Sequence, residues 1–273
     1  MKRVTEARRH GGTFAAILIA SSLALSSCAT RRLTLPTDPG VPFPDAAAVY
    51  AQLSAACTGA KTLTAELGLS GHAGRQRLRG RALAGFARPD AMRLEGVAPF
   101  GAPAFILASR GRTAILLLPR DDRVLRGAQA EEILGALAGI ALAPADLHAI
   151  LTGCVVPAPE PLEGRLHGDS WASIPLQGGA VVYLQRVGGM WQIRAARRGS
   201  WEIEYERWTG GFPRLVRFRS AGSPNVTVDL TADINQLETN VKLDPAAFKV
   251  DVPADAAPIT LDELRESGPL RGS

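Results

Sequence analysis

The chain has 273 residues, of which 46% are hydrophobic and 21% are charged, a composition that excludes both a disordered chain and a polytopic membrane protein. Its formal net charge is +5, but residues 1–27 contain four basic residues and one acidic residue, so the rest of the chain carries only +2. So small a surplus does not predict binding to nucleic acid.

The chain begins with a segment that has the features of a secretory signal peptide. Basic residues come first, followed by an apolar stretch from Thr13 to Leu25 and then by Ser26-Ser27-Cys28. The apolar stretch is shorter than the roughly 20 residues that a transmembrane helix needs. Residues 25–28 resemble the bacterial lipobox, in which the cysteine receives a lipid and becomes the new N-terminus. An ordinary signal peptide with an incidental cysteine is the alternative.

A lipid on Cys28 predicts a protein that is anchored to a membrane through a Pro-rich tether. Ala29 follows Cys28, whereas an aspartate there would, by resemblance to enterobacterial lipoproteins, favour the inner membrane. The absence of an aspartate therefore leads us to expect the outer membrane. The predicted parts are the signal peptide (1–27), the anchor and tether (28–43), a folded domain (44–250) and a Pro-rich C-terminal tail (251–273).

The folded domain begins with a predicted helix over 44–56, where apolar residues recur at helical spacing. Apolar and polar residues then alternate, which predicts strands at 62–70, 78–86, 91–97, 105–109 and 113–118. Two helices follow, at 128–138 and 144–151, and a glycine ends each of them. Strands resume at 180–186, 190–195, 200–206, 214–219 and 226–230, and a short helix is expected near 261–265.

This order of elements places helices between two groups of strands. It predicts an α+β fold, with one large antiparallel sheet and the helices grouped on one of its faces. The chain shows no alternation of strands and helices in βαβ units, which argues against a Rossmann-type parallel sheet.

Few residues are candidates for catalysis or for metal binding. The histidines after the leader are not spaced with other ligand types as zinc sites require. Gly168-Asp169-Ser170 resembles the nucleophile block of one serine-hydrolase family, but the partner Asp-x-x-His motif is not in its expected place. A turn is the preferred interpretation of this segment. We therefore expect no enzymatic activity, no metal, and no cofactor other than the covalent lipid on Cys28.

Two cysteines remain, Cys57 and Cys154, each near the end of a predicted helix. If the signal peptide directs export, both lie in an oxidising compartment, where a disulfide between helix ends is possible. Two buried free thiols are the alternative, and the sequence leaves both open.

The run from Met92 to Gly153 resembles the LolB family of outer-membrane lipoprotein receptors, and more loosely the LolA family of periplasmic carriers. The shared elements follow one another in the same order: the strand MRLEG, Ala98-Pro99-Phe100-Gly101, the strand AFILA, a hairpin ending in Val124-Leu125, the helix Ala130-Glu131-Glu132-Ile133-Leu134, the connector 138–142, and a helix closing in Ile150-Leu151-Thr152-Gly153. No single motif is strict, so the specificity of the resemblance comes from their succession.

The resemblance implies a strongly curved, incomplete β-barrel over 44–250, whose helices cover the open concave side and enclose an apolar cavity for acyl chains. The side chains expected to line that cavity are Leu67, Leu69, Leu94, Phe105, Leu107, Ile133, Leu137, Leu147, Ile150 and Leu151. Plain core packing is the alternative for each of them.

The implied function is non-enzymatic. A monomer at the outer membrane, facing the periplasm, would receive lipoprotein cargo from a LolA-like carrier and insert it into the membrane. A carrier or sensor of another envelope amphiphile, such as a glycolipid or a phospholipid, is the alternative with the same fold.

The family has an exposed apolar residue in a Pro-x-Gly loop, which engages the membrane during insertion. By position this residue is Phe100, between Pro99 and Gly101, although the family usually has leucine there. An aromatic ring suits the membrane interface. The alternative is that Phe100 packs the hairpin onto its own sheet.

Overall fold

The computed structural model describes residues 33–74, 76–98, 100–220 and 228–267. The chain divides into two compact units, residues 1–34 and residues 35–273. The helices and strands of the described residues belong to the second unit. In the part of the chain that is described, no helix combines the length and the apolar character needed to cross a membrane.

The helices are α1 (Ala46–Gly59), α2 (Ala130–Ala138), α3 (Pro144–Thr152) and α4 (Leu261–Ser267). The strands before α2 are β1 (Val41–Phe43), β2 (Thr62–Ala73), β3 (Gln76–Ala87), β4 (Ala91–Val97), β5 (Ile106–Arg110), β6 (Thr113–Leu118) and β7 (Arg123–Arg126). The strands after α3 are β8 (Gly164–His167), β9 (Trp171–Pro175), β10 (Val181–Val187), β11 (Met190–Arg198), β12 (Trp201–Glu206), β13 (Leu215–Ser220), β14 (Val228–Thr239) and β15 (Ala257–Pro258).

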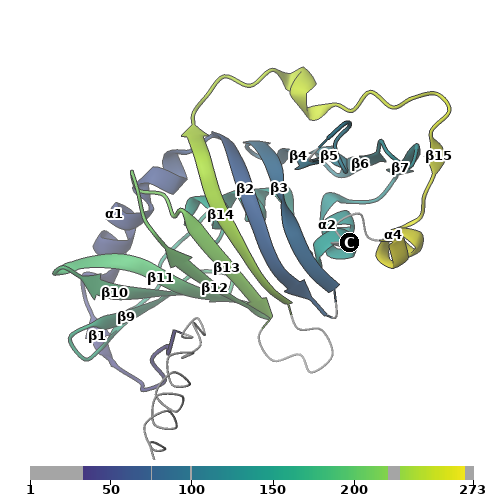
Figure 1. Cartoon of the computed structure of the whole chain (residues 1–273). Helices are drawn as coiled ribbons and strands as arrows, with labels where there is room; N and C mark the ends of the chain where they lie inside the picture. The colour runs from purple at the N-terminus through teal and green to yellow at the C-terminus, as the bar shows by residue number, and fades with distance from the viewer. Residues whose placement is uncertain (1–32, 75, 99, 221–227, 268–273) are drawn as a thin grey trace, which may run out of the picture. The chain divides into compact units, whose positions relative to one another are not determined.

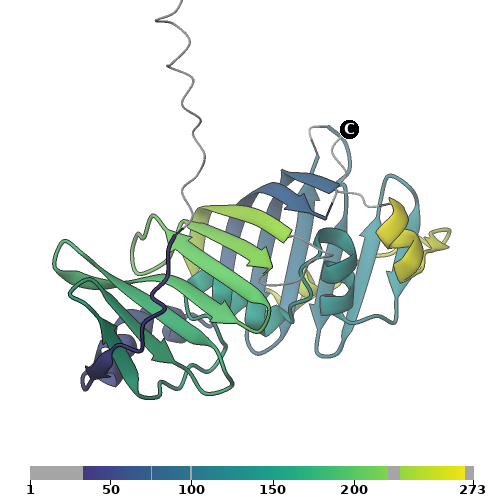
Figure 2. The same cartoon turned by 90° about the horizontal axis from the view of Figure 1, so that it is seen from below.

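All of these strands belong to one sheet, in the order β1-β8-β9-β10-β11-β12-β13-β14-β2-β3-β4-β5-β6-β7-β15. Neighbouring strands are antiparallel except β15 and β7, which are parallel. The two end strands, β1 and β15, do not pair with each other, so the sheet stays open. Figures 1 and 2 show β1 and α4 at opposite ends of the sheet. The predicted single, curved, incompletely closed antiparallel sheet is confirmed.

The alternation predicted from the sequence decides which face of each strand is dry. In β12, Ile203 and Tyr205 are fully buried on the inner face, whereas Glu202 and Glu206 point outward. Glu204 also points outward, but it is buried, because Arg219 of β13 donates two hydrogen bonds to its carboxylate, at 2.7 and 3.2 Å. The charged ladder on this outer face therefore stabilises the same strands whose other face forms the core.

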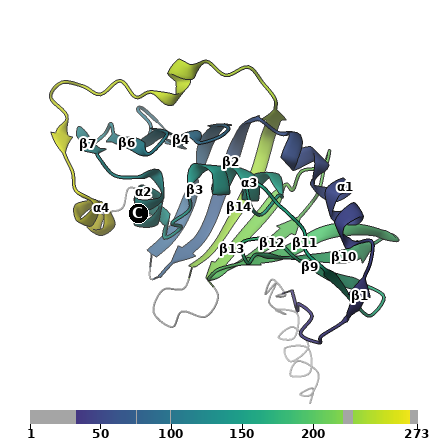
Figure 3. The same ribbon diagram turned by 180° about the vertical axis from the view of Figure 1, so that it is seen from behind.

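The helices α1, α2 and α3 lie on the concave side of the sheet, as the view from behind shows (Figure 3). Helix α1 packs against β8 and β11, α2 against β5 and β6, and α3 against β4. Both short helices have strong local signals. A capping box of Gln129 and Glu132 starts α2, Pro144 starts α3, and left-handed glycines at 139 and 153 end them.

The C-terminal segment crosses from β14 to the far end of the sheet, as the yellow strand and helices show in Figure 1. A 3₁₀ turn, Pro245–Phe248, packs on β4 and β5, where Arg93 donates hydrogen bonds to the carbonyls of Ala247 and Lys249. The chain then pairs with β7 as β15 and continues into α4, which packs on α2. The predicted short helix is present, and the segment that the sequence describes as a tail contributes Ile259 and Leu264 to the core.

The sequence assigns residues 41–43 to the tether, whereas the structure pairs them with β8 as strand β1. Leu35, earlier in the same segment, is also buried. Strands β8 and β9 likewise have no counterpart among the predicted elements. They are only four and five residues long, and runs that short carry little periodic signal.

Candidate functional site

An apolar cavity lies between helices α2 and α3 and the inner face of strands β2, β3, β4, β13 and β14. The residues that line it are Leu67, Leu69, Leu78, Arg79, Gly80, Arg81, Ala82, Leu94, Phe105, Leu134, Ala138, Ile140, Leu147, Leu151, Phe218, Leu230, Thr231 and Ala232. The cavity volume is about 100 Å³, and the empty space that includes the open mouth is about 810 Å³. The cavity is therefore a narrow, nearly apolar slot rather than a wide basin.

The ten residues that the sequence predicts as lining divide into two groups. Six of them border the cavity: Leu67, Leu69, Leu94, Phe105, Leu147 and Leu151. The other four, Leu107, Ile133, Leu137 and Ile150, are buried in the core and do not border it. For these four, the alternative of plain core packing describes what the structure shows.

Small side chains on the sheet create the hollow. Gly80, Ala82 and Ala232 all border the cavity on the strands opposite the two helices. A Cβ atom built on Gly80 meets no atom within 4 Å, so the space in front of this residue is empty. The signal was visible in the sequence, because small residues stand at inward positions of the predicted strand 78–86.

The large side chain of Phe105 can form part of the cavity wall because the residue beneath its ring, Gly96, has no side chain. The ring of Phe105 lies over Gly96 of β4, where an added Cβ would approach the ring to 2.6 Å. Any other residue at 96 would push the ring away. Gly96 therefore positions Phe105 in the wall.

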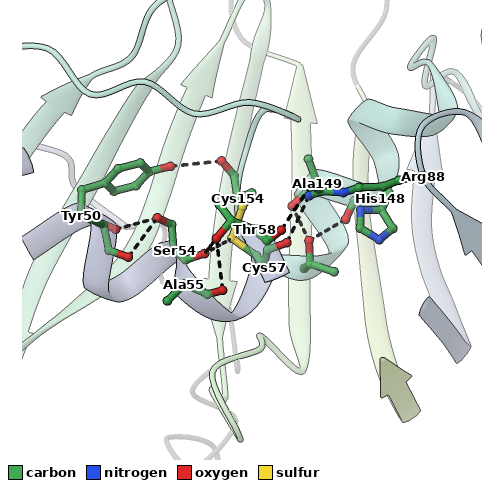
Figure 4. Close-up of a disulfide and its surroundings, with 11 residues drawn as sticks. Tyr50, Ser54, Ala55, Cys57, Thr58, Arg88, His148, Ala149 and Cys154 are labelled. Atoms are coloured by element: carbon green, nitrogen blue, oxygen red, sulfur yellow. Dashed lines mark hydrogen bonds between the residues drawn. A yellow bond between two sulfur atoms is a disulfide. The ribbon is translucent and has the colours of Figure 1, made fainter. Parts of the chain in front are cut away.

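Helix α3, which forms one side of the cavity, is tied down at both ends. Near its start, Asp146 makes an ion pair of 2.7 Å with Arg198 of β11. Just after its end, Cys154 is joined to Cys57 of α1 by a disulfide (Figure 4). Of the two alternatives that the sequence leaves open for these cysteines, the structure has the disulfide.

The groups around the disulfide hold α1 and α3 in one arrangement (Figure 4). The hydroxyl of Tyr50 donates to the carbonyl of Cys154 at 3.2 Å, and burial raises the pKa of Tyr50. Arg88 donates to the carbonyl of Cys57 at 3.1 Å. The end of α3 is therefore fixed to α1 by the disulfide and the buried hydrogen bond from Tyr50, and the start of α3 is fixed to β11 by the ion pair.

His148 lies on the side of α3 that faces the edge of Phe86, with ring centroids 5.9 Å apart. It is 2% exposed, and neither ring nitrogen has a hydrogen-bond partner among the described residues. Burial, together with the nearby charge of Arg88, lowers its pKa from 6.5 to about 4. His148 is therefore neutral near pH 7. Protonation of its buried ring would destabilise the packing of α3 against Phe86.

The loop between β4 and β5 carries Phe100, whose surface is 88% exposed. Its backbone is held from the side, because Arg120 donates hydrogen bonds to the carbonyls of Phe100 at 2.8 Å and Ala102 at 3.3 Å. Gly101 has a positive φ of 75°. The ring thus projects into solvent from an anchored backbone instead of packing on its own sheet.

Two predicted site residues, Cys28 and Pro99, lie outside the described residues. The lipidation of Cys28 therefore remains a prediction from the sequence.

Ser170 lies in the turn that joins β8 to β9, as the preferred interpretation of its sequence motif predicts. The adjacent histidine, His167, directs its ring elsewhere: Nε2 lies 2.8 Å from Ser173 Oγ, and Nδ1 lies 3.0 Å from Asp38 Oδ1. The hydrogen bond with His167 lowers the pKa of the Asp38 carboxyl. We refer to these three side chains as the Asp38–His167–Ser173 network.

The network has the order of a serine-hydrolase triad but not its surroundings. Ser173 stands within β9, whose backbone pairs with Arg165 of β8 on one side and Tyr183 of β10 on the other. The backbone N–H groups beside Ser173 are thus committed to the sheet, whereas a hydrolase aims such groups at an oxyanion. In this protein the network attaches the segment around Asp38 to the outer face of the sheet.

No protein-family model and no curated protein matches the chain. Solved structures resemble it weakly. A LolA superfamily protein from Nitrosomonas europaea is 10% identical, with a TM-score of 0.48 over 75% of this chain and 97% of that chain. A DUF1329 family protein from Desulfovibrio piger is 14% identical, with a TM-score of 0.47 over 78% of this chain and 98% of that chain. A putative outer membrane lipoprotein-sorting protein domain from Vibrio parahaemolyticus is 13% identical, with a TM-score of 0.42 over 73% of this chain and 94% of that chain. All three scores are below 0.5.

Proposed function

We propose that this protein is a lipid-anchored envelope protein that holds acyl chains in the cavity beneath α2 and α3 and hands lipoproteins to the outer membrane in the manner of LolB. The observation that carries the proposal is the cavity itself: a narrow slot with a nearly apolar lining, built from small residues on the sheet and leucines on the two helices. A slot of this kind suits a polymethylene chain, which gains about 0.8 kcal/mol for each CH₂ group that leaves water.

Three further features support the same proposal. The lipobox-like segment that ends in Cys28 would anchor the protein to a membrane. Phe100 projects from an anchored loop, where its ring could enter the headgroup region of a bilayer. The charged side chains of the buried network around Glu204 lie on the outer face of the sheet, away from the cavity.

Cavity filling tests the binding site directly. Gly80→Leu places a side chain into the empty space in front of β3, and we expect it to abolish saturable binding of a fluorescent fatty-acyl probe. The assay uses the mature chain with Cys28→Ser, so that no attached lipid competes. Gly85→Leu is the matched control: it is a glycine of the same strand, an added Cβ also meets no atom within 4 Å, and it borders a hollow on the outer face. Equal probe binding by both variants would overturn the proposed site.

The Phe100 loop gives a second test, of delivery rather than of binding. Phe100→Glu puts a charge at an 88% exposed position, so folding and probe binding should be unchanged while transfer of a bound lipoprotein to vesicles slows. Phe100→Leu keeps an apolar side chain and should transfer normally. Equal transfer rates for the two variants would remove the loop from the mechanism.

Depletion of the protein in cells distinguishes lipoprotein cargo from the alternative cargo, another envelope amphiphile. Mislocalised lipoproteins support the LolB-like role, including receipt of cargo from a periplasmic carrier. Normal lipoprotein sorting together with retained acyl binding supports a carrier or sensor of a glycolipid or phospholipid.

A further inference from the structure

A second apolar point projects from the protein, at the turn between β10 and β11. Val187 and Met190 face each other across this turn and are 49% and 74% exposed. Gly188 and Gly189 join them, both with positive φ, so the turn is tight and offers no side chain against which they could pack. We refer to residues 187–190 as the hairpin tip.

The pair of residues behind the tip has the composition of a membrane interface. Arg186 lies over the ring of Trp191, with the guanidinium carbon 4.8 Å from the ring centroid. Tryptophan is enriched where a protein meets the headgroup level of a bilayer, and an arginine beside it can reach lipid phosphates. The hairpin tip is therefore an exposed apolar projection, and an aromatic residue, Trp191, and a basic residue, Arg186, lie next to it.

The N-terminal segment of the chain joins the sheet beside this tip. Phe43 of β1 packs on Trp191, with ring centroids 5.7 Å apart. The segment before β1 is held in place, since Leu35 is buried and Asp38 contacts His167. Gly40 lies so close to the sheet that an added Cβ would come within 2.6 Å of the carbonyl of Leu166. The tether is thus attached to the sheet from Leu35 onward.

This attachment leaves a short stretch of sequence between Leu35 and the predicted lipid attachment point. Seven residues, 28–34, separate the predicted lipid attachment point from Leu35, and they span at most about 24 Å when fully extended. A tether free up to residue 43 would reach about twice as far. A lipid on Cys28 would therefore hold Leu35 within about 24 Å of the membrane, in the same N-terminal segment whose Phe43 contacts Trp191 behind the tip.

We propose that the hairpin tip is a membrane-docking element, which inserts Val187 and Met190 into the headgroup region of the anchoring bilayer with Trp191 and Arg186 at its surface. The proposal rests on the proposed function only for the lipid on Cys28. The tip and the Phe100 loop belong to separate parts of the sheet, because five strands lie between β11 and β4, a separation of about 30 Å along the sheet. The strand register places them at opposite strand ends, because the tip precedes β11 whereas the Phe100 loop follows β4.

Vesicle sedimentation tests the docking. The mature chain with Cys28→Ser is mixed with vesicles of phosphatidylethanolamine and phosphatidylglycerol, so that the attached lipid makes no contribution. We expect Val187→Ser combined with Met190→Ser to lower the partition coefficient about fivefold, because two apolar side chains no longer leave water. Leu83→Ser is the matched control, since Leu83 is 48% exposed but lies on the outer face of β3. Its partition coefficient should stay that of the parent chain.

An environment-sensitive fluorophore gives a second readout that does not depend on loss of binding. Attached at Met190→Cys, it should shift its emission to the blue when vesicles are added, and at Leu83→Cys it should not. Unchanged partitioning of the double serine variant, or no spectral shift at position 190, overturns the docking proposal. Acyl-probe binding is measured on the same proteins. Failure of the parent chain to bind the probe would sink the proposed function, while tip-dependent sedimentation would still support the docking.

Discussion

The concave side of the sheet is filled under α1 and hollow under α2 and α3. In the filled region, Tyr50 of α1 and Ile203 and Tyr205 of β12 are at most 1% exposed. In the hollow region, Gly80 and Ala82 occupy the corresponding inward positions of β3 and leave a slot. Both regions alternate apolar and polar residues in the same way. The difference shows that side-chain volume, and not hydrophobic patterning, decides where this fold has a core and where it has a cavity.

The disulfide joins the two regions, and its removal should have the largest effect. Replacing Cys57 and Cys154 by alanine opens a loop of 97 residues in sequence separation, so the free energy of unfolding should fall by about 4 kcal/mol. Urea denaturation measures this loss, and the reduced parent chain should lose a similar amount. A loss below about 1 kcal/mol would show that the buried contacts alone hold α3 on α1.

The resulting variant would also sharpen the comparison. With the covalent tie gone, α3 retains the ion pair between Asp146 and Arg198 but is freer to move over the cavity. We therefore expect faster exchange of the acyl probe at an unchanged fold, which far-ultraviolet circular dichroism checks.

A matched pair of truncations compares the regions directly. Ile203→Ala removes a side chain that is surrounded on all sides and should cost about 3–4 kcal/mol of unfolding free energy. Leu134→Ala removes a side chain that already borders empty space and has fewer contacts to lose, so about 1–2 kcal/mol is expected.

Acyl-probe binding supplies the complementary measurement for this pair. Leu134→Ala widens the slot and should change the probe affinity, whereas Ile203→Ala should leave it alone. Equal costs in stability together with equal affinities would mean that the hollow region is packed as tightly in solution as the filled one.

Much of the fold could be predicted from the sequence, because alternation and helix caps act locally. The clean pattern from Trp201 to Glu206 corresponds to β12, and the glycines at 139 and 153 end the two helices where the sequence places their ends. Strand β1 and the C-terminal segment could not be predicted in this way. Their places depend on pairing with β8 and β7, which are far away along the chain.

The candidate site was predictable in part for the same reason. Inward positions such as Leu67 and Leu94 follow from alternation, and they border the cavity. Leu107 follows the same alternation on β5 and Ile150 follows the helical spacing of α3, but both face filled space, which only the packing of neighbouring elements decides. The Asp38–His167–Ser173 network joins residues 129 apart in sequence and gave no local signal.

Acid should destabilise the packing of α3 over the hollow region before it affects the filled region. The reason is that His148, a buried group that titrates, lies where α3 packs against Phe86. Its pKa is about 4 in the folded protein against an ordinary value of 6.5, so the unfolded chain takes up the proton more readily as the pH falls. Stability is therefore complete above about pH 6.5 and declines toward pH 4 through this residue. At pH 5 the loss should be roughly 2 kcal/mol, measured by urea denaturation across this range.

The matched variant for this prediction is His148→Leu, which fills the same space beside Phe86 without a group that takes up a proton. Between pH 7 and pH 5 it should lose less stability than the parent chain by roughly the 2 kcal/mol assigned to the imidazole. The charge of Arg88 opposes protonation of His148. If both proteins lose the same stability on acidification, protonation of His148 does not set the acid sensitivity, and the packing of α3 is insensitive to pH in this range.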